Sequence, residues 1–278
     1  MPGAKHRFGS VACKPMLLLL DIGNTHTHVG LASGKRLRPL GDIPTTGWSN
    51  GSASRRLRRL VGRAPVSAAS LCSVVPHATR RVREAVGGFW DLCAFVLTPR
   101  TVRGVGINYP RPETIGPDRL ANAVAAKHLF GAPAVVVDFG TAVTLDVVDP
   151  RGDYVGGIIA PGLAAMTSYL HEKAALLPRI RIREVRRSIG RNTEEAMLIG
   201  AVHGYRGMVR ELIGELKREL GTQHLPVVAT GGYAALIASG LTEVSAVRPQ
   251  LTLEGLRLVW EIQAHPSGED DRKSGGSL

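Results

Sequence analysis

The chain has 278 residues, with 35 Lys and Arg against 23 Asp and Glu, and its formal net charge is +12. Its hydrophobic content of 44% is enough to fill a core, which excludes a wholly disordered protein. Aromatic residues make up only 5%, which disfavours a stacking platform for single-stranded nucleic acid, and three cysteines are too few for a disulfide framework or a cysteine-based zinc site.

Both ends of the chain differ in composition from the rest. Residues 1–15 have no hydrophobic periodicity and residues 265–278 are rich in Gly, Ser and charge, so we expect both segments to be disordered. In between, apolar runs predict strands at residues 16–20, 28–31, 69–75, 134–137, 145–148 and 226–229. Helical patterns occupy residues 54–61, 78–86, 119–130, 161–176, 194–219, 233–239 and 252–264. This alternation is typical of an α/β fold.

One pattern occurs twice in the chain. Residues 17–32 read LLLLDIGNTHTHVGLA and residues 134–149 read AVVVDFGTAVTLDVVD. Each is an apolar strand that ends in Asp-x-Gly-(Asn/Thr), followed by a tight turn and a second strand. Asp21 and Asp138 are 117 positions apart, which is about one domain length, so the sequence predicts a duplicated domain. We place the two halves at residues 16–118 and 119–264.

The repeated turn has the chemistry of a phosphate site. Gly23 permits a close backbone approach, and Asn24 and Thr25 add short polar groups and backbone donors. Asp21, at the strand end, could hold a hydrated Mg²⁺ that bridges phosphates. The alternative for one copy is an ordinary hairpin with an Asx turn. Two copies after two apolar strands favour phosphate chemistry.

A third carboxylate follows the sequence Gly116-Pro117, at the start of a predicted helix. Asp118 is a candidate base for the acceptor hydroxyl in phosphoryl transfer, and the alternative is that it only caps the helix. Two glycine-rich segments, 156–162 and 230–233, are expected as loops before helices, where anions often bind. Thr193 is a candidate cap for the long helix. The sequence contains no P-loop, no protein-kinase catalytic motif and no zinc-site spacing.

Taken together, the ordered motifs resemble the type III pantothenate kinases, bacterial enzymes of coenzyme A synthesis in the actin-like kinase superfamily. The similarity runs from about residue 16 to about 264. It rests on LDIGNT at 20–25, Tyr109 followed by GPDRLAN at 116–122, VDFGTAVTLDVVD at 137–149 and YVGGIIAPGL at 154–163. The segments LLPRI at 176–180, GRNTEEAMLIG at 190–200 and ATGGYA at 229–234 complete it.

The resemblance implies two actin-like, ribonuclease H-like domains with ATP in the cleft between them, and phosphorylation of pantothenate. The ATP-binding residues it implies are Asp21, Ile22, Gly23, Asn24, Thr25, His26, Thr27, His28 and Thr141. The substrate-binding residues it implies are Tyr109, Gly116, Pro117, Asp118, Arg119 and Thr193, with Asp118 as the catalytic base. It also implies that Asp138 binds a monovalent cation, K⁺ or NH₄⁺. We expect Mg²⁺ at Asp21, held directly or through water.

By resemblance the protein is a cytoplasmic homodimer whose partner subunit helps to close the substrate pocket. No apolar run is long enough for a membrane span or a secretory leader. Pro117 and Ala174 stand where a small residue and a Thr are usual in the family.

Two alternatives remain open at this point. One is a DNA-associated regulatory factor of the same fold. The sequence feature for it is the positive charge, especially at Arg55, Arg56, Arg58 and Arg59, although a solvated helix face explains that cluster too. The other is an actin-like kinase for another small hydroxylated substrate. The complete set of kinase residues disfavours nucleic acid as the partner.

Overall fold

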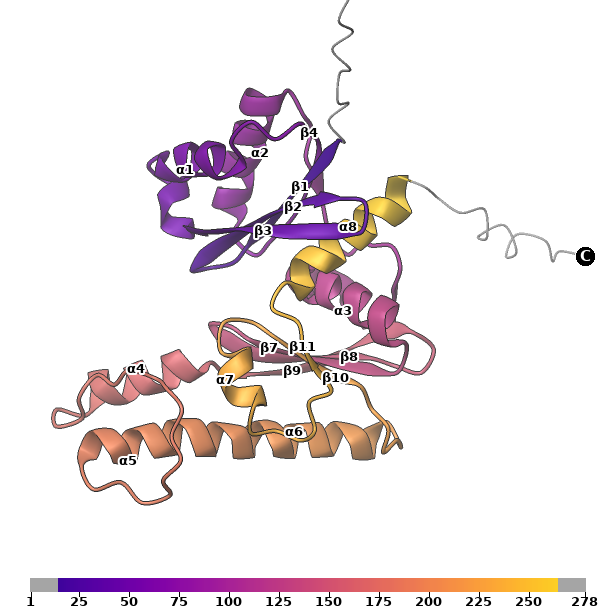
Figure 1. Ribbon diagram of the computed structural model, residues 1–278. Helices are drawn as coiled ribbons and strands as arrows, with labels where there is room; N and C mark the ends of the chain where they lie inside the picture. Colours follow the sequence, from indigo (N-terminus) through magenta and orange to yellow (C-terminus); the bar gives the residue numbers. More distant parts are fainter. Residues whose placement is uncertain (1–14, 265–278) are drawn as a thin grey trace, which may run out of the picture.

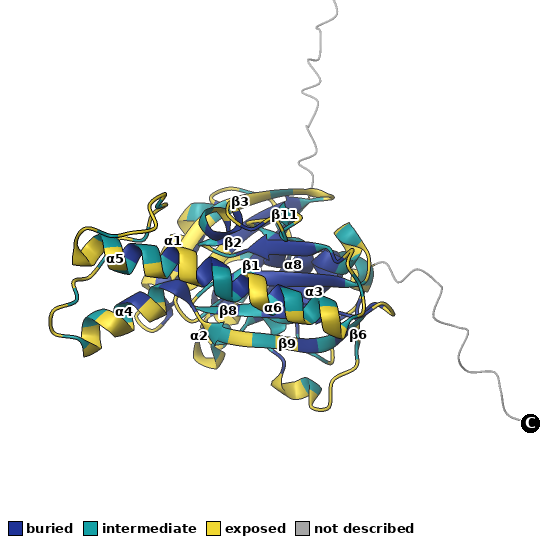
Figure 2. Cartoon of the chain, turned by 90° about the horizontal axis from the view of Figure 1, so that it is seen from below, coloured by how far each residue is buried: buried dark blue, intermediate teal, exposed yellow. Residues whose placement is uncertain are grey.

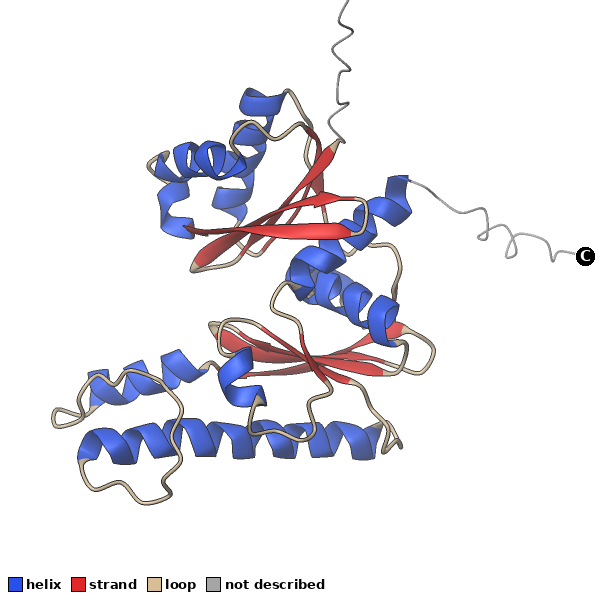
Figure 3. Cartoon of the chain, viewed as in Figure 1, coloured by secondary structure: helices blue, strands red, loops and turns tan. Residues whose placement is uncertain are grey.

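Two β-sheets organise the protein. The computed structural model describes residues 15–264, so the segments 1–15 and 265–278, expected to be disordered, lie outside the described residues apart from Pro15. The first sheet has the order β3 (Arg36–Pro44), β2 (His26–Ser33), β1 (Met16–Ile22), β4 (Val66–Ser73) and β5 (Phe95–Val96). The second has the order β11 (Ala246–Val247), β10 (Val227–Thr230), β7 (Ala134–Phe139), β8 (Ala142–Val148), β9 (Asp153–Pro161) and β6 (Gly106–Ile107) (Figure 3).

The two sheets repeat one topology. In the first, β1 pairs antiparallel with β2 and parallel with β4, while β2 pairs antiparallel with β3 and β4 parallel with β5. The second repeats each pairing in the same chain order, with β7, β8, β9, β10 and β11 in place of β1 to β5. The short strand β6 adds to the far edge of β9. The predicted duplication is therefore confirmed strand by strand.

Helices fill three layers around these sheets. Their bounds are α1 (Ser52–Val61), α2 (Pro76–Trp90), α3 (Pro117–Phe130), α4 (Leu163–Lys173), α5 (Thr193–Ile199), α6 (Tyr205–Glu219), α7 (Ala234–Ala238) and α8 (Leu251–Ala264). A π-turn at Gly200–Gly204 joins α5 to α6, so the predicted long helix is one continuous run. Figure 1 shows α3 and α8 between the two sheets, α1 and α2 beyond the first sheet, and α6 beyond the second.

Strand alternation explains this layering. Leu17 and Leu19 of β1 belong to the central core with α3 and α8, whereas Leu18 and Leu20 face the core that includes α1 and α2. Helix α3 is buried at seven consecutive positions, from Leu120 to Ala126, because it packs against both sheets and α8. The outer helix α6, in front in Figure 2, instead carries exposed positions along its length. The last helix thus closes on β1 and β4, two neighbouring strands of the first sheet.

The sequence did not predict β3 or β9. Strand β3 is an outer strand with charged residues at Arg36, Arg38 and Asp42, so it carries little hydrophobic signal. Gly156 and Gly157, expected in a loop, lie inside β9, where pairing with β8 overrides their low strand propensity. Within residues 15–264, no helix combines the length and apolarity that a membrane crossing requires.

Candidate active site

Three carboxylates from separate elements lie near one another at the junction of the two halves. Asp21 ends β1, Asp138 occupies the equivalent place in β7, and Asp118 lies in the first turn of α3. Burial and the negative charge of Asp118 raise the pKa of Asp21 to about 6. Burial and the charges of Asp21 and Asp118 raise the pKa of Asp138 to about 7. This concentration of buried negative charge favours the binding of a cation.

Asp118 is positioned by the start of its helix. Gly116 is the N-cap and Pro117 takes the first helical position, where no N–H is needed, so the departure at 117 leaves the helix intact. The Asp118 carboxylate accepts the Arg119 N–H at 2.9 Å, which makes it a first-turn acceptor and not the N-cap residue. Burial raises the pKa of Asp118, although the N–H and the charge of Arg119 oppose that shift. A carboxyl pKa shifted toward neutrality suits a general base.

The β1–β2 turn is fastened by a residue of the following short helix. The N–H of Gly23 donates to the His26 carbonyl at 2.9 Å, and the Thr45 hydroxyl donates to the Gly23 carbonyl at 2.7 Å. Asn24, Thr25 and His26 are exposed on the turn. Ile22 and Thr27 are fully buried, and Thr27 accepts the Trp48 indole N–H at 3.0 Å, so their side chains face the core.

The equivalent β7–β8 turn meets the first one. The hydroxyls of Thr25 and Thr141 are 3.2 Å apart. The loop before α7 joins them, since the Tyr233 N–H donates to the Phe139 carbonyl at 3.3 Å. Gly231 has a φ of +90°, and a Cβ there would lie 2.5 Å from Asp138 Oδ1. Three backbone turns therefore meet beside the ends of β1 and β7, an arrangement that suits a phosphate site.

A second set of side chains holds these groups in place, and sequence reasoning gave none of them a role. Cys72 of β4 donates to Asp21 at 3.3 Å, and Asn122 of α3 donates to Asp138 at 3.3 Å. Asp42 accepts from His28 Nδ1 at 2.7 Å. Burial lowers the pKa of His28, but Asp21 and Asp42 outweigh burial, and the net shift is upward.

Arg119 and Tyr109 lie together on the α3 side of the second sheet. Arg119 Nε donates to Asp146 of β8 at 2.5 Å, and its guanidinium lies 5.8 Å from the centre of the Tyr154 ring. The Tyr109 ring packs edge-on against Tyr154 at 6.2 Å. Sequence reasoning missed Asp146 and Tyr154. An Asp between Leu145 and Val147, in the middle of an apolar strand, was the available signal.

Thr193 is the predicted site residue that the structure does not bring to this group. It begins α5, which Figure 1 shows on an arm formed with α4 beyond the second sheet. The cap of this helix is Asn192, whose side chain accepts the Glu195 N–H at 2.9 Å, so the prediction of Thr193 as the cap is wrong. Among residues 15–264, no hydrogen bond or ion pair links Thr193 to the other predicted residues.

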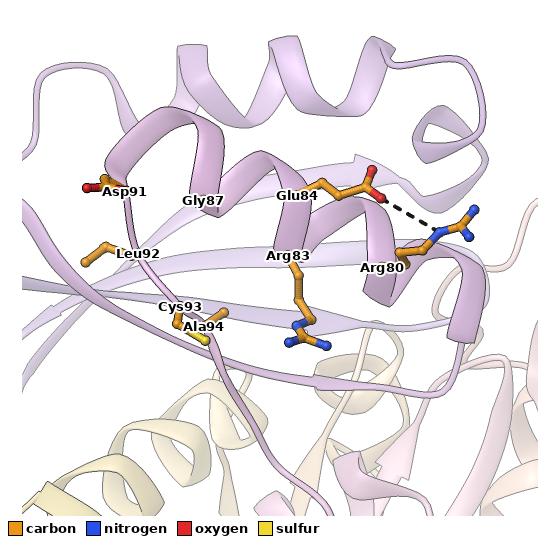
Figure 4. Close-up of a pocket in the computed structure, with 8 residues that line it drawn as sticks. All are labelled: Arg80, Arg83, Glu84, Gly87, Asp91, Leu92, Cys93 and Ala94. Atoms are coloured by element: carbon orange, nitrogen blue, oxygen red, sulfur yellow. Dashed lines mark ion pairs between the residues drawn. The ribbon is translucent and has the colours of Figure 1, made fainter.

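The described residues contain no ready-made metal centre. Within residues 15–264, no three His, Cys, Asp or Glu side chains gather closely enough to hold a metal ion by themselves. A separate open pocket of about 580 Å³ lies beside α2 and is lined by Arg80, Arg83, Cys93 and their neighbours (Figure 4). None of the predicted site residues lines it. Any cation held near the junction carboxylates would thus need further ligands from a bound molecule or from water.

A duplicated sheet with a carboxylate at the same position in each repeat and phosphate-type turns at the junction defines an actin-like phosphotransferase. The family model of type III pantothenate kinase matches residues 17–215. The chain belongs to this family, and it is a kinase.

Relatives support the assignment over most of the chain. A type III pantothenate kinase of Methylacidiphilum infernorum is 47% identical over 247 residues, which cover 88% of this chain and 88% of that protein. One of Akkermansia muciniphila is 46% identical over 243 residues, covering 87% and 96%. A solved structure from Campylobacter jejuni, described as a conserved member of the Baf family of transcriptional activators, covers 90% of this chain and 98% of its own at 18% identity with a TM-score of 0.55. That last likeness concerns the fold alone.

Proposed function

We propose that this protein transfers the γ-phosphate of ATP to the primary hydroxyl of pantothenate and makes 4′-phosphopantothenate, the first step of coenzyme A synthesis. The observation that carries this proposal is the convergence of Asp21, Asp118 and Asp138 beside two equivalent turns. Family membership gives the substrate class, since the relatives are named for pantothenate.

Each part of the reaction has residues suited to it. The two turns, around Gly23 to Thr25 and at Thr141, would bind the ATP phosphates through backbone N–H groups and hydroxyls. Asp118 would accept the proton of the attacking hydroxyl, and Arg119 and Tyr109 would bind the rest of the substrate. Phosphoryl transfer needs mainly positioning and charge neutralisation, so one base and a set of fixed donors suffice.

The carboxylates suit the cations that such a reaction uses. Asp21 would hold Mg²⁺ through phosphate oxygens or water, and Asp138 would hold K⁺ or NH₄⁺. Their donor oxygens are hard ligands, and burial together with the neighbouring carboxylates raises the pKa of both groups although His28 opposes the shift, so a bound cation would favour their ionised forms. When bound, these ions would neutralise charge on the transferring phosphoryl group.

We also propose a homodimer that completes the site. Helix α4 exposes Met166, Tyr169 and Leu170, and Leu176 just beyond it is 92% exposed. An apolar face of this kind needs a partner. A second copy packed there would explain why Thr193 is separated from Asp118 in one chain, because Thr193 would then serve the partner's pocket. We place the dimer in the cytoplasm, where ATP is available and the free thiols of Cys72 and Cys93 stay reduced.

Mixing two inactive variants tests this shared site. Asp118→Asn and Thr193→Ala proteins, unfolded and refolded together in equal amounts, should recover about a quarter of the wild-type activity, since half the dimers would carry one intact site of two. Each variant refolded alone is the control. No recovery in the mixture, with dimers present in sedimentation, would place Thr193 in the site of its own chain.

The substrate is tested by a panel of hydroxylated acids and sugars assayed for phosphorylated product by mass spectrometry. Pantothenate should be the only substrate converted at high rate. Phosphorylation of a sugar in preference to pantothenate would favour an actin-like kinase for another hydroxylated substrate.

The alternative of a DNA-associated factor is tested by titration with duplex DNA at two salt concentrations. We expect no binding at moderate salt, because α1 is a solvated amphipathic helix.

A further inference from the structure

We propose that Asp146 and Tyr154 are positioning residues that fix both Arg119 and Tyr109, and so set the recognition of the anionic end of the substrate. The inference rests on the proposed function for the identity of that substrate. Neither residue belongs to the set that the sequence motifs predict for the site. Both lie behind that set, on neighbouring antiparallel strands β8 and β9.

Asp146 is a fully buried carboxylate with three donors. Its Oδ1 accepts from Arg119 Nε at 2.5 Å and from the Tyr154 hydroxyl at 3.3 Å, and its Oδ2 accepts from Thr144 Oγ1 at 3.1 Å. A charged group buried within a β-sheet costs folding free energy unless it is paired and hydrogen-bonded. This carboxylate is therefore held in one orientation, and it holds the guanidinium in turn.

Arg119 still has unused hydrogen-bonding capacity. Within the described residues, its buried Nη2 has no hydrogen-bond partner, whereas its Nε is engaged by Asp146. Its guanidinium also lies over the ring of Tyr154, which restricts it further. A Cβ at Gly157 would overlap the Leu145 carbonyl oxygen and would also lie 3.0 Å from Nη2, so the neighbouring backbone requires glycine here, and glycine also leaves space beside this guanidinium. A fixed cation with a free donor edge matches a carboxylate or carbonyl oxygen of a ligand.

Tyr154 also contacts Tyr109, the second residue proposed to bind the substrate. Its ring meets Tyr109 edge-on, and a Cβ at Gly156 would lie only 3.3 Å from Tyr109 Cε2. Burial and the nearby Asp146 raise the pKa of Tyr154, so its hydroxyl stays protonated and donates. One buried side chain thus contacts Asp146, Arg119 and Tyr109. Its loss should loosen both substrate residues without touching the ATP turns.

Two variants separate this role from a general structural one. Tyr154→Phe keeps the ring against Tyr109 and Arg119 but removes the hydroxyl, and Asp146→Asn removes the charge that fixes Arg119. We expect Tyr154→Phe to raise the KM for pantothenate about fivefold, and Asp146→Asn more than tenfold, with the KM for ATP within about twofold of wild type. Both should also lower the preference for pantothenate over pantothenol, its uncharged alcohol analogue.

Glu261→Gln is the matched control. It removes the carboxylate partner of another buried arginine, Arg257, whose Nη1 lies 2.7 Å from Glu261 on α8. It should change thermal stability but neither KM value. If Asp146→Asn does not fold, the KM values of Tyr154→Phe alone test the positioning role. Equal rises in both KM values, or an unchanged preference for pantothenate over pantothenol in Tyr154→Phe, would overturn the positioning role.

Assays of the wild-type enzyme distinguish a failure of this inference from a failure of the proposed function. If wild type shows no pantothenate-dependent ADP release, the proposed function fails and the variants are not needed to show it. If wild type turns over pantothenate and the variants behave like wild type, only the positioning role fails.

Discussion

The hydroxyls of Thr25 and Thr141 lie 3.2 Å apart although 116 positions separate them in the chain. They come from equivalent turns, β1–β2 in the first repeat and β7–β8 in the second. The duplication therefore brings two copies of one turn to a single point, beside a carboxylate from each repeat. Neither half by itself would surround a triphosphate.

Removing one of these hydroxyls should weaken ATP binding selectively. We expect Thr141→Val to raise the KM for ATP about tenfold and to leave the KM for pantothenate nearly unchanged, because a hydrogen bond to a charged group is lost. Initial-rate kinetics with each substrate varied would measure this. Thr79→Val, which removes a hydroxyl that donates to the carbonyl of Val75, the N-cap residue of α2, is the control. Equal effects on both KM values would argue against the assignment.

Asp118→Asn should leave the fold and ATP binding intact and lower kcat by about 10²–10⁴-fold, since it removes the base but keeps the shape. The wild-type carboxylate accepts the Arg119 N–H, which the Asn oxygen can also accept. Coupled ADP release measures kcat, and the shift in melting temperature with ATP measures binding. A variant with near-normal turnover would exclude Asp118 as the base.

Neighbouring glycines before α7 offer a paired test of the backbone around Asp138. Gly231 has a positive φ, and a Cβ there would meet Asp138 Oδ1 and the Phe139 backbone at 2.5 to 2.7 Å, whereas a Cβ at Gly232 meets nothing within 4 Å. Gly231→Ala should destabilise the protein by about 2 kcal/mol or more and impair activity, while Gly232→Ala should do neither. Urea unfolding compares them. The reverse ranking would contradict the loop geometry.

The buried carboxylates should make the ligand-free protein less stable as pH rises. The pKa of Asp21 is about 6 and that of Asp138 about 7, both above the ordinary 3.8, so the folded state keeps protons that the unfolded chain has released. The free energy of unfolding should therefore fall between pH 4 and pH 7 and then level off.

Asp138→Asn removes one of the titrations that contribute to this fall and relieves charge repulsion. At pH 8, without Mg²⁺ or K⁺, we expect the variant to be more stable than wild type by about 1–3 kcal/mol, and the difference should shrink toward pH 4. Urea unfolding at pH 4.5, 6 and 8 measures this. Parallel pH profiles for the two proteins would show that Asp138 is not a source of the dependence.

Sequence reasoning located the main groups because they follow local rules. Asp21 and Asp138 end apolar strands in a repeated pattern, and Asp118 stands beside a proline at a helix start, so strand and helix signals alone placed them. Their closeness follows from the duplication. The contacts of Asp146, Tyr154 and Asn122 could not be predicted in the same way. The Asp within an apolar strand was a local signal, but its pairing with Arg119 depends on how α3 packs on the second sheet.

The net positive charge of the chain was the feature that said least about its function. Arg55, Arg56 and Arg59 are exposed on α1 opposite the buried Leu57, as expected for a solvated face. Arg58 lies over the rings of Phe89 and Trp90 at 5.9 and 5.6 Å and so serves packing within the first half. The surplus of +12 is therefore partly surface character, away from the carboxylates at the junction.

The central claim is tested most directly by ADP release from ATP and Mg²⁺, with and without pantothenate, in K⁺ and then in Na⁺. We predict release that depends on pantothenate and is many times faster in K⁺. Release that is the same with and without pantothenate in K⁺, or no release at all from folded protein, would contradict the account.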